Sequence, residues 1–316
     1  MTGSLIHSKV IATAILIVVL LMLPLELHAL DRDITISVYQ GPCADGDFSK
    51  NLATTRQVVK EALGQGSDFV VLPETFLSGY DTPPHMRQGA RRMEDPDLQA
   101  FIAESSTHSM VILVGLARQT DPGIYNSELV IHRGKVLGIY DKIMLTEGDR
   151  DELRFLPGKE MPVFTAHGVR FGVIICHDSS FPYPALIARL KGAEILFSPH
   201  YNSIPAQTVD AHRKWVRNCH IGLACQMKMV VARSNVVVAG DPKDVGYGDS
   251  FILSPQGEML AEAELFRTEL LTVKITPKHF QFPVVWADLG ETPAVLKETL
   301  ARLLMAEGVP KDPANK

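Results

Sequence analysis

The chain has 316 residues, of which 46% are hydrophobic and 21% are charged, so it can bury a sizeable core, and intrinsic disorder is excluded. Its formal net charge is −5, and basic residues form no run beyond isolated pairs, which argues against nucleic acid as a partner. The 4 cysteines include no Cys-x-x-Cys pair, so neither a disulfide scaffold nor a structural zinc ribbon is expected.

An uncharged, mostly apolar run at residues 10–25, between Lys9 and Glu26, marks the N-terminal segment. A membrane-spanning helix needs about 20 apolar residues, whereas a shorter run fits the hydrophobic region of a signal peptide. We therefore expect residues 1–30 to be a signal peptide or an N-terminal membrane anchor, with membrane contact only through residues 10–25. The protein would then be exported (periplasmic or extracytoplasmic) or membrane-anchored, and it would be cytoplasmic if the start codon is mis-called.

From residue 31 onward, strand-like and helix-like patterns alternate along the chain. In the first half we expect strands at 34–39, 69–72 and 111–116, a hairpin at 128–131 and 136–140, and helices at 52–63 and 98–105. In the second half we expect strands at 171–175, 195–197 and 229–232, a hairpin at 250–253 and 259–263, and helices at 185–190, 209–227 and 295–304. The pattern has no linker and no internal repeat, which predicts one mixed α/β domain over residues 31–290, followed by a C-terminal helix and tail over residues 291–316.

Three reactive side chains stand at the ends of apolar strands: Glu74, Lys142 and Cys176. Taken singly, a charged residue after a strand is usually solvated, and a cysteine there is usually a small core residue. Ligands of α/β sheets, however, gather at the carboxyl ends of strands, so we expect these three side chains to meet.

Together the three residues would supply the nucleophile, the base and the oxyanion stabiliser that acyl transfer needs, without a histidine. A thiol attacks a carbonyl or nitrile carbon only as the thiolate, so Cys176 needs a base to remove its proton. The carboxylate of Glu74 can act as that base if partial burial raises its pKa towards neutrality. A fixed cation at Lys142 can stabilise the oxyanion that forms on the substrate.

Five segments, in order and at consistent spacing, resemble the nitrilase superfamily of carbon–nitrogen hydrolases. They cover residues 72–80 (LPETFLSGY), 140–143 (YDKI), 152–158 (ELRFLPG), 172–178 (GVIICHD) and 248–258 (GDSFILSPQGE). The resemblance extends over roughly residues 33–275, so residues 31–290 are expected to form a carbon–nitrogen hydrolase domain. It departs from the family pattern at Tyr183 and Gln226, where many members carry glutamate.

The resemblance implies a four-layer αββα sandwich, with two packed mixed β-sheets and helices outside. It also implies a homo-dimer or a higher homo-oligomer. It assigns Glu74 as general base, Lys142 as stabiliser of the oxyanion and Cys176 as nucleophile. Glu152 would be the supporting residue that holds Lys142 or the substrate amine in place. Tyr80 falls where the family often lines its pocket, although it could equally be a packed aromatic residue.

Other candidate sites are weaker. His177 follows Cys176, but adjacent residues leaving a strand point in different directions, so we expect it to shape the pocket wall rather than act as the base. We expect Asp178 to orient the loop as a hydrogen-bond acceptor. The other histidines have no ligand spacing with acids or cysteines, so no metal site is expected. No phosphate-binding loop or dinucleotide fingerprint occurs, so no cofactor is expected.

The residues after the cysteine bear on the substrate class. In the family, nitrilases typically show Cys-Trp-Glu and lipoprotein acyltransferases Cys-Tyr-Glu, whereas residues 176–178 (CHD) resemble the amidase and carbamoylase group. This implies a hydrolase of a small amide that works through a cysteine thioester and releases ammonia. An N-carbamoyl amine or amino-acid hydrolase is the second interpretation. An envelope acyltransferase, which would explain the N-terminal segment but normally needs several spanning helices, is the third.

Overall fold

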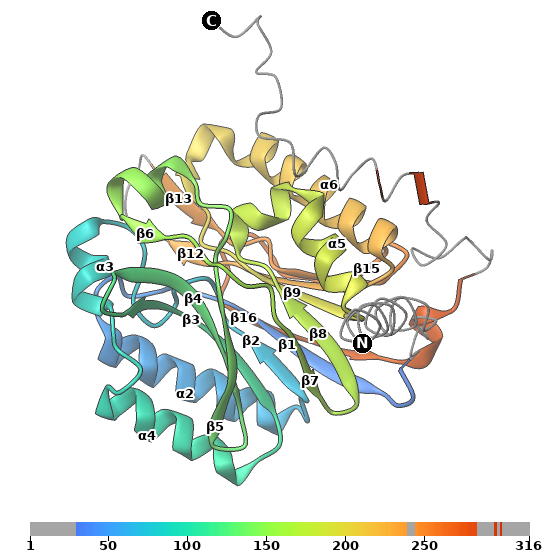
Figure 1. Ribbon diagram of the computed structural model, residues 1–316, viewed down its shortest axis with the longest axis horizontal. Helices are drawn as coiled ribbons and strands as arrows, with labels where there is room; N and C mark the ends of the chain where they lie inside the picture. The colour runs from blue at the N-terminus through green and yellow to red at the C-terminus, as the bar shows by residue number, and fades with distance from the viewer. Residues whose placement is uncertain (1–29, 239–243, 283–293, 296–297, 299–316) are drawn as a thin grey trace, which may run out of the picture. The chain divides into compact units, whose positions relative to one another are not determined.

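Two β-sheets packed face to face form the centre of the protein, and helices cover their outer faces (Figure 1). The computed structural model describes residues 30–238, 244–282, 294, 295 and 298. Both sheets belong to one unit, Ala29–Gln281. The expected signal peptide or anchor and the helix expected at 295–304 lie almost entirely outside the described residues. Within the described part of the chain, no helix is long and apolar enough to cross a membrane.

The first sheet is built from the N-terminal half of the chain and closed by one strand from its end. In spatial order its strands are β16 (Glu269–Ile275), β1 (Ile34–Gln40), β2 (Phe69–Val71), β3 (Val111–Gln119), β4 (Ile124–His132) and β5 (Lys135–Asp141), and β6 (Phe155–Leu156) pairs with β4. The three central strands β1, β2 and β3 run parallel, and the outer pairs are antiparallel. This parallel centre explains the continuous apolar runs seen in the sequence, since such strands are buried on both faces.

The second sheet repeats this arrangement with strands from the C-terminal half. In spatial order its strands are β15 (Met259–Glu262), β14 (Phe251–Leu253), β11 (Val230–Ser234), β9 (Ile195–Pro199), β8 (Val169–Val173) and β7 (Val163–Ala166). Strands β8, β9 and β11 are parallel. A small third sheet contains β10 (Ser203–Pro205), β13 (Asp244–Tyr247) and β12 (Val237–Val238).

Helices form the two outer layers. On the first sheet lie α2 (Phe48–Gly64) and α4 (Pro96–Glu104), whose buried faces share one apolar cluster with that sheet. On the second sheet lie α5 (Pro182–Leu190) and α6 (Val209–Met227), which also pack on each other. The short helices are α3 (Pro83–Gly89), the 3-10 turns η1 (Ser105–Thr107), η3 (Cys176–Ser180), η4 (Ala206–Thr208) and η5 (Pro277–Phe280), and the π-helical turn η2 (Gly148–Glu152). The predicted αββα sandwich is therefore confirmed (Figure 1).

Aromatic side chains packed between the two sheets fix the position of one sheet on the other. Phe69 from the first sheet contacts Phe171 and Phe197 from the second, with ring centroids 5.2 and 5.5 Å apart. All three rings are fully buried. Burial of an aromatic side chain of this size contributes roughly 1.5–3 kcal/mol, so this contact fixes the strands whose ends carry the site.

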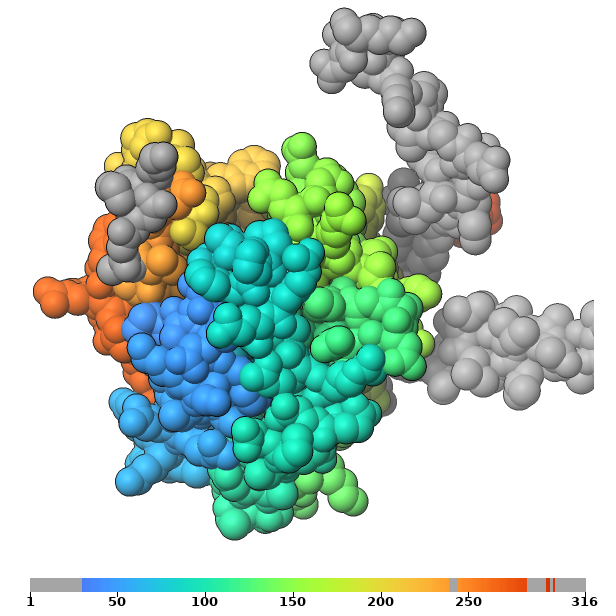
Figure 2. All heavy atoms as spheres, turned by 90° about the vertical axis from the view of Figure 1, so that its left-hand side faces the viewer, coloured from blue at the N-terminus to red at the C-terminus, as the bar shows by residue number. Residues whose placement is uncertain are grey.

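One side of the molecule is formed mainly by segments from the N-terminal half. Figure 2 shows α3 and its neighbours in teal between the blue α2 and the green segment that follows β5. Met86 and Ala90, at α3, share an apolar cluster with Leu145, Leu153 and Phe155, which explains why these segments lie together. The loops after β2 and β5 therefore meet on this side.

All strands and helices predicted between residues 31 and 263 are present, with ends shifted by a few residues. The prediction missed α3, β6, β7, β16 and the small third sheet. Strand β16 is the largest omission, because it pairs with β1 over seven residues, from Ile34↔Ile275 to Gln40↔Glu269.

Candidate active site

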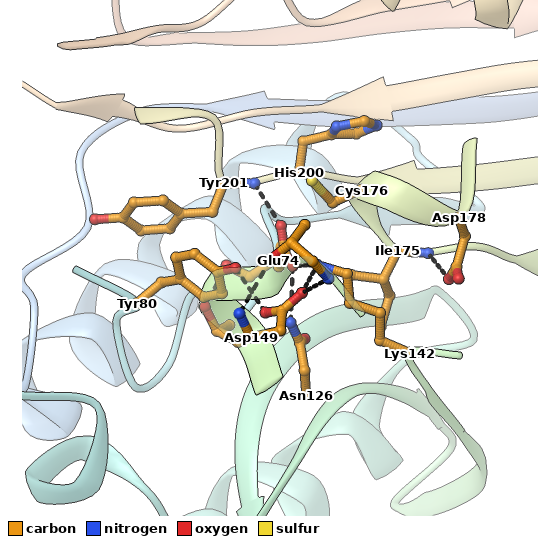
Figure 3. Close-up of polar contacts among 12 residues, drawn as sticks. Glu74, Tyr80, Asn126, Lys142, Asp149, Ile175, Cys176, Asp178, His200 and Tyr201 are labelled. Atoms are coloured by element: carbon orange, nitrogen blue, oxygen red, sulfur yellow. Dashed lines mark hydrogen bonds and ion pairs between the residues drawn. The ribbon is translucent and has the colours of Figure 1, made fainter. Parts of the chain in front are cut away.

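Glu74 lies at the turn that follows β2, and its carboxylate is fully buried. Oε1 accepts hydrogen bonds from Lys142 Nζ at 2.8 Å and Asn126 Nδ2 at 2.7 Å, and Oε2 accepts one from the Tyr201 backbone N–H at 2.8 Å (Figure 3). Every polar partner of the carboxylate is thus a donor, which stabilises its charged form and fixes its direction.

The backbone at this turn is strained. Thr75 has φ of +46°, a value that residues other than glycine rarely adopt. The turn is also pressed against β3, since a Cβ added to Gly115 would lie 2.1 Å from the Thr75 backbone nitrogen. Glycine is therefore required at position 115 for the two backbones to approach. Strain of this kind is typical of functional turns.

Lys142 follows β5 and is fully buried between two carboxylates. Its Nζ lies 2.8 Å from Glu74 Oε1 and 2.9 Å from Asp149 Oδ2. Burial alone would lower the pKa of Lys142, but the nearby negative groups, Glu74 foremost, outweigh burial and hold this pKa well above its usual value. Lys142 is therefore a fixed cation at neutral pH.

Besides Glu74, the acidic partner that the structure places against Lys142 is Asp149 and not Glu152, so the contact expected between Glu152 and Lys142 is not formed. The π-helical turn η2 directs Asp149 inwards, where it is fully buried, and leaves Glu152 exposed. Asp149 also accepts hydrogen bonds from Tyr80 Oη at 2.6 Å and from the Thr146 backbone N–H at 2.9 Å. Tyr80 thus contacts the site through its hydroxyl while its ring packs near Tyr201, with centroids 5.2 Å apart.

Cys176 begins the 3-10 turn η3 just beyond β8 and has φ of +47°. Like Thr75, it adopts a left-handed conformation that costs about 1–3 kcal/mol. The strained turn lifts the sulfur out of the line of the strand towards Glu74 and Lys142 (Figure 3). The three residues predicted from the strand ends are therefore brought together in one place, with Cys176 from the second sheet and the other two from the first.

Asp178 connects the two loops that carry Cys176 and Lys142. Its carboxylate accepts hydrogen bonds from the Ile175 N–H at 2.9 Å, the Tyr140 hydroxyl at 2.7 Å and the Met144 N–H at 2.7 Å. Tyr140 and Met144 lie on either side of Lys142. The prediction that Asp178 orients the loop as an acceptor is confirmed.

The electrostatics of the site favour a neutral thiol in the resting protein. Burial raises the pKa of the Cys176 thiol, the negative charge of Glu74 raises it further, and Lys142 acts in the opposite direction. Burial also raises the pKa of the Glu74 carboxyl, while Lys142 and Asn126 oppose this rise. The arrangement is thus a thiol beside a carboxylate of increased basicity, with a fixed cation in contact with that carboxylate.

Three buried or partly buried histidines, His177, His200 and His220, make ring contacts or pair with each other. His177 is partly buried, and its ring meets that of Phe181 edge to face with centroids 5.2 Å apart. His200 and His220 form a buried pair, with their Nε2 atoms 3.2 Å apart. In the described part of the chain, no group of three or more histidine, cysteine, aspartate or glutamate side chains could hold a metal ion.

Glu128, on β4, is a buried acid next to the site. Neither of its carboxyl oxygens has a hydrogen-bond partner among the residues that the structure describes, and the side chain is fully buried. Burial raises the pKa of Glu128 well above its usual value, and the charge of Glu74 adds to the rise. Burial therefore favours the neutral form of the Glu128 carboxylic acid in the folded protein.

Glu128→Gln is expected to gain stability relative to the wild type as the pH rises. The unfolded wild type loses the proton of Glu128 near its usual pKa of about 4.3, whereas the folded protein keeps it to a higher pH. The unfolded state then binds fewer protons, so wild-type stability falls with pH in this window, by up to about 1.4 kcal/mol per pH unit. Urea unfolding at about pH 5 and about pH 8 measures the free energy of unfolding of both proteins. If that free energy changes with pH by the same amount in both, Glu128 is not protonated in the folded protein.

Sequence reasoning missed four residues of the site: Asn126, Asp149, Tyr201 and Asn202. Asn126 and Tyr201 contact the carboxylate of Glu74, and Asn202 contacts Cys176. A signal was present for Tyr201 and Asn202, since they follow the apolar strand predicted at 195–197. Asn126 lies inside a strand, where the sequence pattern alone does not distinguish it from a solvated residue.

The chain is similar in sequence to known proteins. The family profile described as Carbon-nitrogen hydrolase matches residues 35–281. The glutamine-dependent NAD(+) synthetase of Thermotoga maritima is 30% identical over 242 residues, which are 73% of this chain but 40% of that protein. The N-carbamoylputrescine amidase of Arabidopsis thaliana is 29% identical over 256 residues, which are 76% of this chain and 85% of the relative. This chain thus spans about two fifths of the synthetase and most of the amidase.

Solved structures show the same fold. The crystal structure of a carbon–nitrogen hydrolase from Helicobacter pylori G27 superposes with a TM-score of 0.70 at 22% identity, covering 81% of this chain and 92% of the other. Since the family profile covers most of the chain and the fold is shared, this protein is a member of the carbon–nitrogen hydrolases of the nitrilase superfamily and an enzyme that acts on C–N bonds.

Proposed function

We propose that the enzyme hydrolyses a small, non-peptide amide through a thioester on Cys176 and releases ammonia. The observation that carries this proposal is the buried pair of Glu74 and Lys142, 2.8 Å apart, facing the sulfur of Cys176. A hydrogen-bonded acid, a cation and a thiol in one buried place supply the base, the oxyanion stabiliser and the nucleophile that acyl transfer needs.

In the first half of the reaction, the Cys176 sulfur attacks the amide carbon while its proton passes to Glu74. The carbonyl oxygen becomes an oxyanion, which Lys142 stabilises. Glu74 then gives the proton to the amide nitrogen, the C–N bond breaks, and ammonia leaves the thioester. Because burial and the charge of Glu74 favour the neutral thiol in the resting protein, Glu74 must take up its proton for the sulfur to attack.

In the second half, a water molecule attacks the thioester while Glu74 removes one of its protons. A second oxyanion forms beside Lys142, the C–S bond breaks, and the proton returns to sulfur as the carboxylic acid leaves. Asp149 keeps Lys142 in position throughout, through their contact of 2.9 Å. Lys142 thus stabilises both oxyanions without giving up a proton.

A panel of primary amides and N-carbamoyl amines tests the proposal. We expect ammonia release from at least one primary amide, together with a mass increase equal to its acyl group on the peptide that contains Cys176 after rapid quenching in acid. Turnover without any acyl adduct on Cys176 under conditions where the first step is fast would contradict the thioester.

The second candidate is an N-carbamoyl amine or amino-acid hydrolase, which the similarity to N-carbamoylputrescine amidase favours. Such a substrate would yield carbon dioxide and a free amine besides ammonia, so measuring all three products separates the two candidates. An acyltransferase would instead transfer the acyl group from Cys176 to an added amine and leave less free acid.

We further propose that a second copy of the chain covers the outer face of α5 and α6. Five large apolar side chains on these two helices are exposed by 36 to 58%: Tyr183, Ile187, Leu190, Trp215 and Ile221. Apolar residues gathered on one face of a soluble protein typically mark an interaction surface, and self-association of one face gives a twofold dimer.

Trp215→Glu combined with Ile187→Glu is expected to convert the dimer into a monomer, because each protomer would bury two carboxylates without counter-charges in the apolar interface. Sedimentation velocity at micromolar concentration measures the mass. Leu137→Glu is the matched control, since Leu137 is 43% exposed on β5, away from this face. A wild-type protein that sediments as a monomer, or a double variant that remains a dimer, would contradict the interface.

A further inference from the structure

Asn202 contacts the sulfur of Cys176 from the second sheet, whereas Glu74 and Lys142 come from the first. It follows β9 and is 8% exposed. Its Nδ2 lies 3.6 Å from Cys176 Sγ, within the range for a hydrogen bond to sulfur. The side chain has no role in the reaction derived above.

The orientation of the Asn202 amide is fixed by Arg233. The guanidinium Nη2 of Arg233 donates to Asn202 Oδ1 at 2.6 Å. Because a guanidinium can only donate, the atom that faces it must be the oxygen, and the NH₂ group must then face the sulfur. The backbone N–H of Asn202 is held as well, by Asn235 Oδ1 at 2.9 Å.

Arg233, on β11, is fully buried and has no carboxylate in ion-pair distance among the residues that the structure describes. Its Nη1 donates to the backbone carbonyls of Gly248 and Asp249, and its Nε has no hydrogen-bond partner within the described part of the chain. A buried charge without a counter-ion is costly, and carbonyl oxygens compensate it only in part. A positive charge in this place favours negative charge on groups that it reaches through Asn202.

The other side of the sulfur carries an excess of negative charge. There Lys142, with one positive charge, lies between the carboxylates of Glu74 and Asp149. Until Glu74 takes up the proton, negative charge on Sγ is disfavoured from that side, and the amide of Asn202 with Arg233 behind it is a polar group that can favour it.

We propose that Asn202 is a further catalytic residue, whose Nδ2–H donates to the Cys176 sulfur as negative charge develops there, and that Arg233 is the positioning residue that fixes this amide. The inference rests on the proposed role of Cys176 as nucleophile. It assigns Asn202 to both halves of the reaction, since the sulfur is negatively charged when it attacks and again when the thioester breaks. Both events gain from a donor already in place.

Asn202→Asp tests this role better than Asn202→Ala, which would leave Arg233 without its side-chain acceptor. The aspartate keeps an oxygen for Arg233 but places a second carboxylate oxygen where the donor faced the sulfur. We expect alkylation of Cys176 by iodoacetamide to slow by about 10- to 100-fold, the range for a lost hydrogen bond to a charged group. We expect kcat to fall by a similar factor, KM to change little, and the melting temperature not to fall.

The alkylation rate is read from the mass of the peptide that contains Cys176, because the other three cysteines also react. Gln99→Glu, on the exposed side of α4, is the control that adds the same charge far from the site. An alkylation rate within about twofold of the wild type would overturn the proposal, since such a result assigns Asn202 only to binding Arg233. Unfolding of the Asn202→Asp variant would also overturn the proposal. Such a result would mean that Arg233 does not accept a carboxylate oxygen in place of the amide oxygen of Asn202.

Alkylation needs no substrate, so this test is separate from that of the proposed function. If no amide is hydrolysed but Asn202→Asp slows alkylation, Asn202 is still assigned as the donor to the Cys176 sulfur, and the proposal that the substrate is a small amide is rejected. If Cys176 forms an acyl adduct and the variant alkylates at the wild-type rate, only the role of Asn202 fails.

Discussion

Glu74→Gln, Cys176→Ala and the combined variant are all expected to reduce ammonia release by at least about a thousandfold, and to nearly the same level. Glu74 acts only through the proton of Cys176 in the first half-reaction, so removing either group stops the same step. Groups that act as a unit are not additive, and the second substitution then costs little. Ammonia release at saturating substrate measures the three variants.

The Glu74→Gln variant needs a check of its fold, because all three groups that contact the Glu74 carboxylate are donors. The NH₂ group of the introduced glutamine side chain would face one of them, so we expect a stability loss of about 1–3 kcal/mol in that variant and little in Cys176→Ala. Circular dichroism and urea unfolding measure this loss. Losses that multiply in the combined variant would indicate that the acid and the sulfur work in separate steps.

Lys142→Met is expected to lower the free energy of unfolding by about 3–5 kcal/mol and to abolish activity. Without the cation, the carboxylates of Glu74 and Asp149 remain buried with no compensating charge. Their pKa values would rise, so the loss is expected to shrink towards about pH 4, where both acids take up protons. Urea unfolding at about pH 7 and about pH 4 measures this dependence.

Lys135→Met is the matched control, since Lys135 begins the same strand β5 and is exposed. Its stability should stay within about 0.5 kcal/mol of the wild type at both pH values. An equal loss in the two lysine variants, or a loss in Lys142→Met that does not change with pH, would show that the buried ion pair does not carry the stability of the site.

The sequence allowed the main reactive residues to be located because apolar strands constrain where their ends lie. Glu74 and Cys176 each follow a mostly buried parallel strand, and the ends of such strands lie at one edge of a sheet. Lys142 instead follows the partly exposed antiparallel strand β5. The alternation of strands and helices predicted a mixed α/β domain, and the resemblance to the nitrilase superfamily implied its αββα layers. Strand β16 was missed because its residues are only partly buried and its partner β1 lies more than two hundred residues away.

The supporting residues could not be located in this way. Glu152 and Asp149 are three residues apart in one π-helical turn, and only the winding of that turn decides which of them meets Lys142. Arg233 interrupts an apolar strand, which is a signal that a charge is buried, but nothing in the sequence connects it with Asn202 or with the sulfur. Contacts between the two sheets depend on three-dimensional packing and leave no local pattern.

The division of the site between the two sheets has a consequence for the newly made chain. Glu74 and Lys142 leave the ribosome before Cys176, and Arg233 follows later still. Until the aromatic residues between the sheets have closed, the sulfur has neither its proton acceptor nor its donors. A nascent or partly folded chain therefore carries an ordinary thiol, and the catalytic arrangement exists only once the two sheets have packed together.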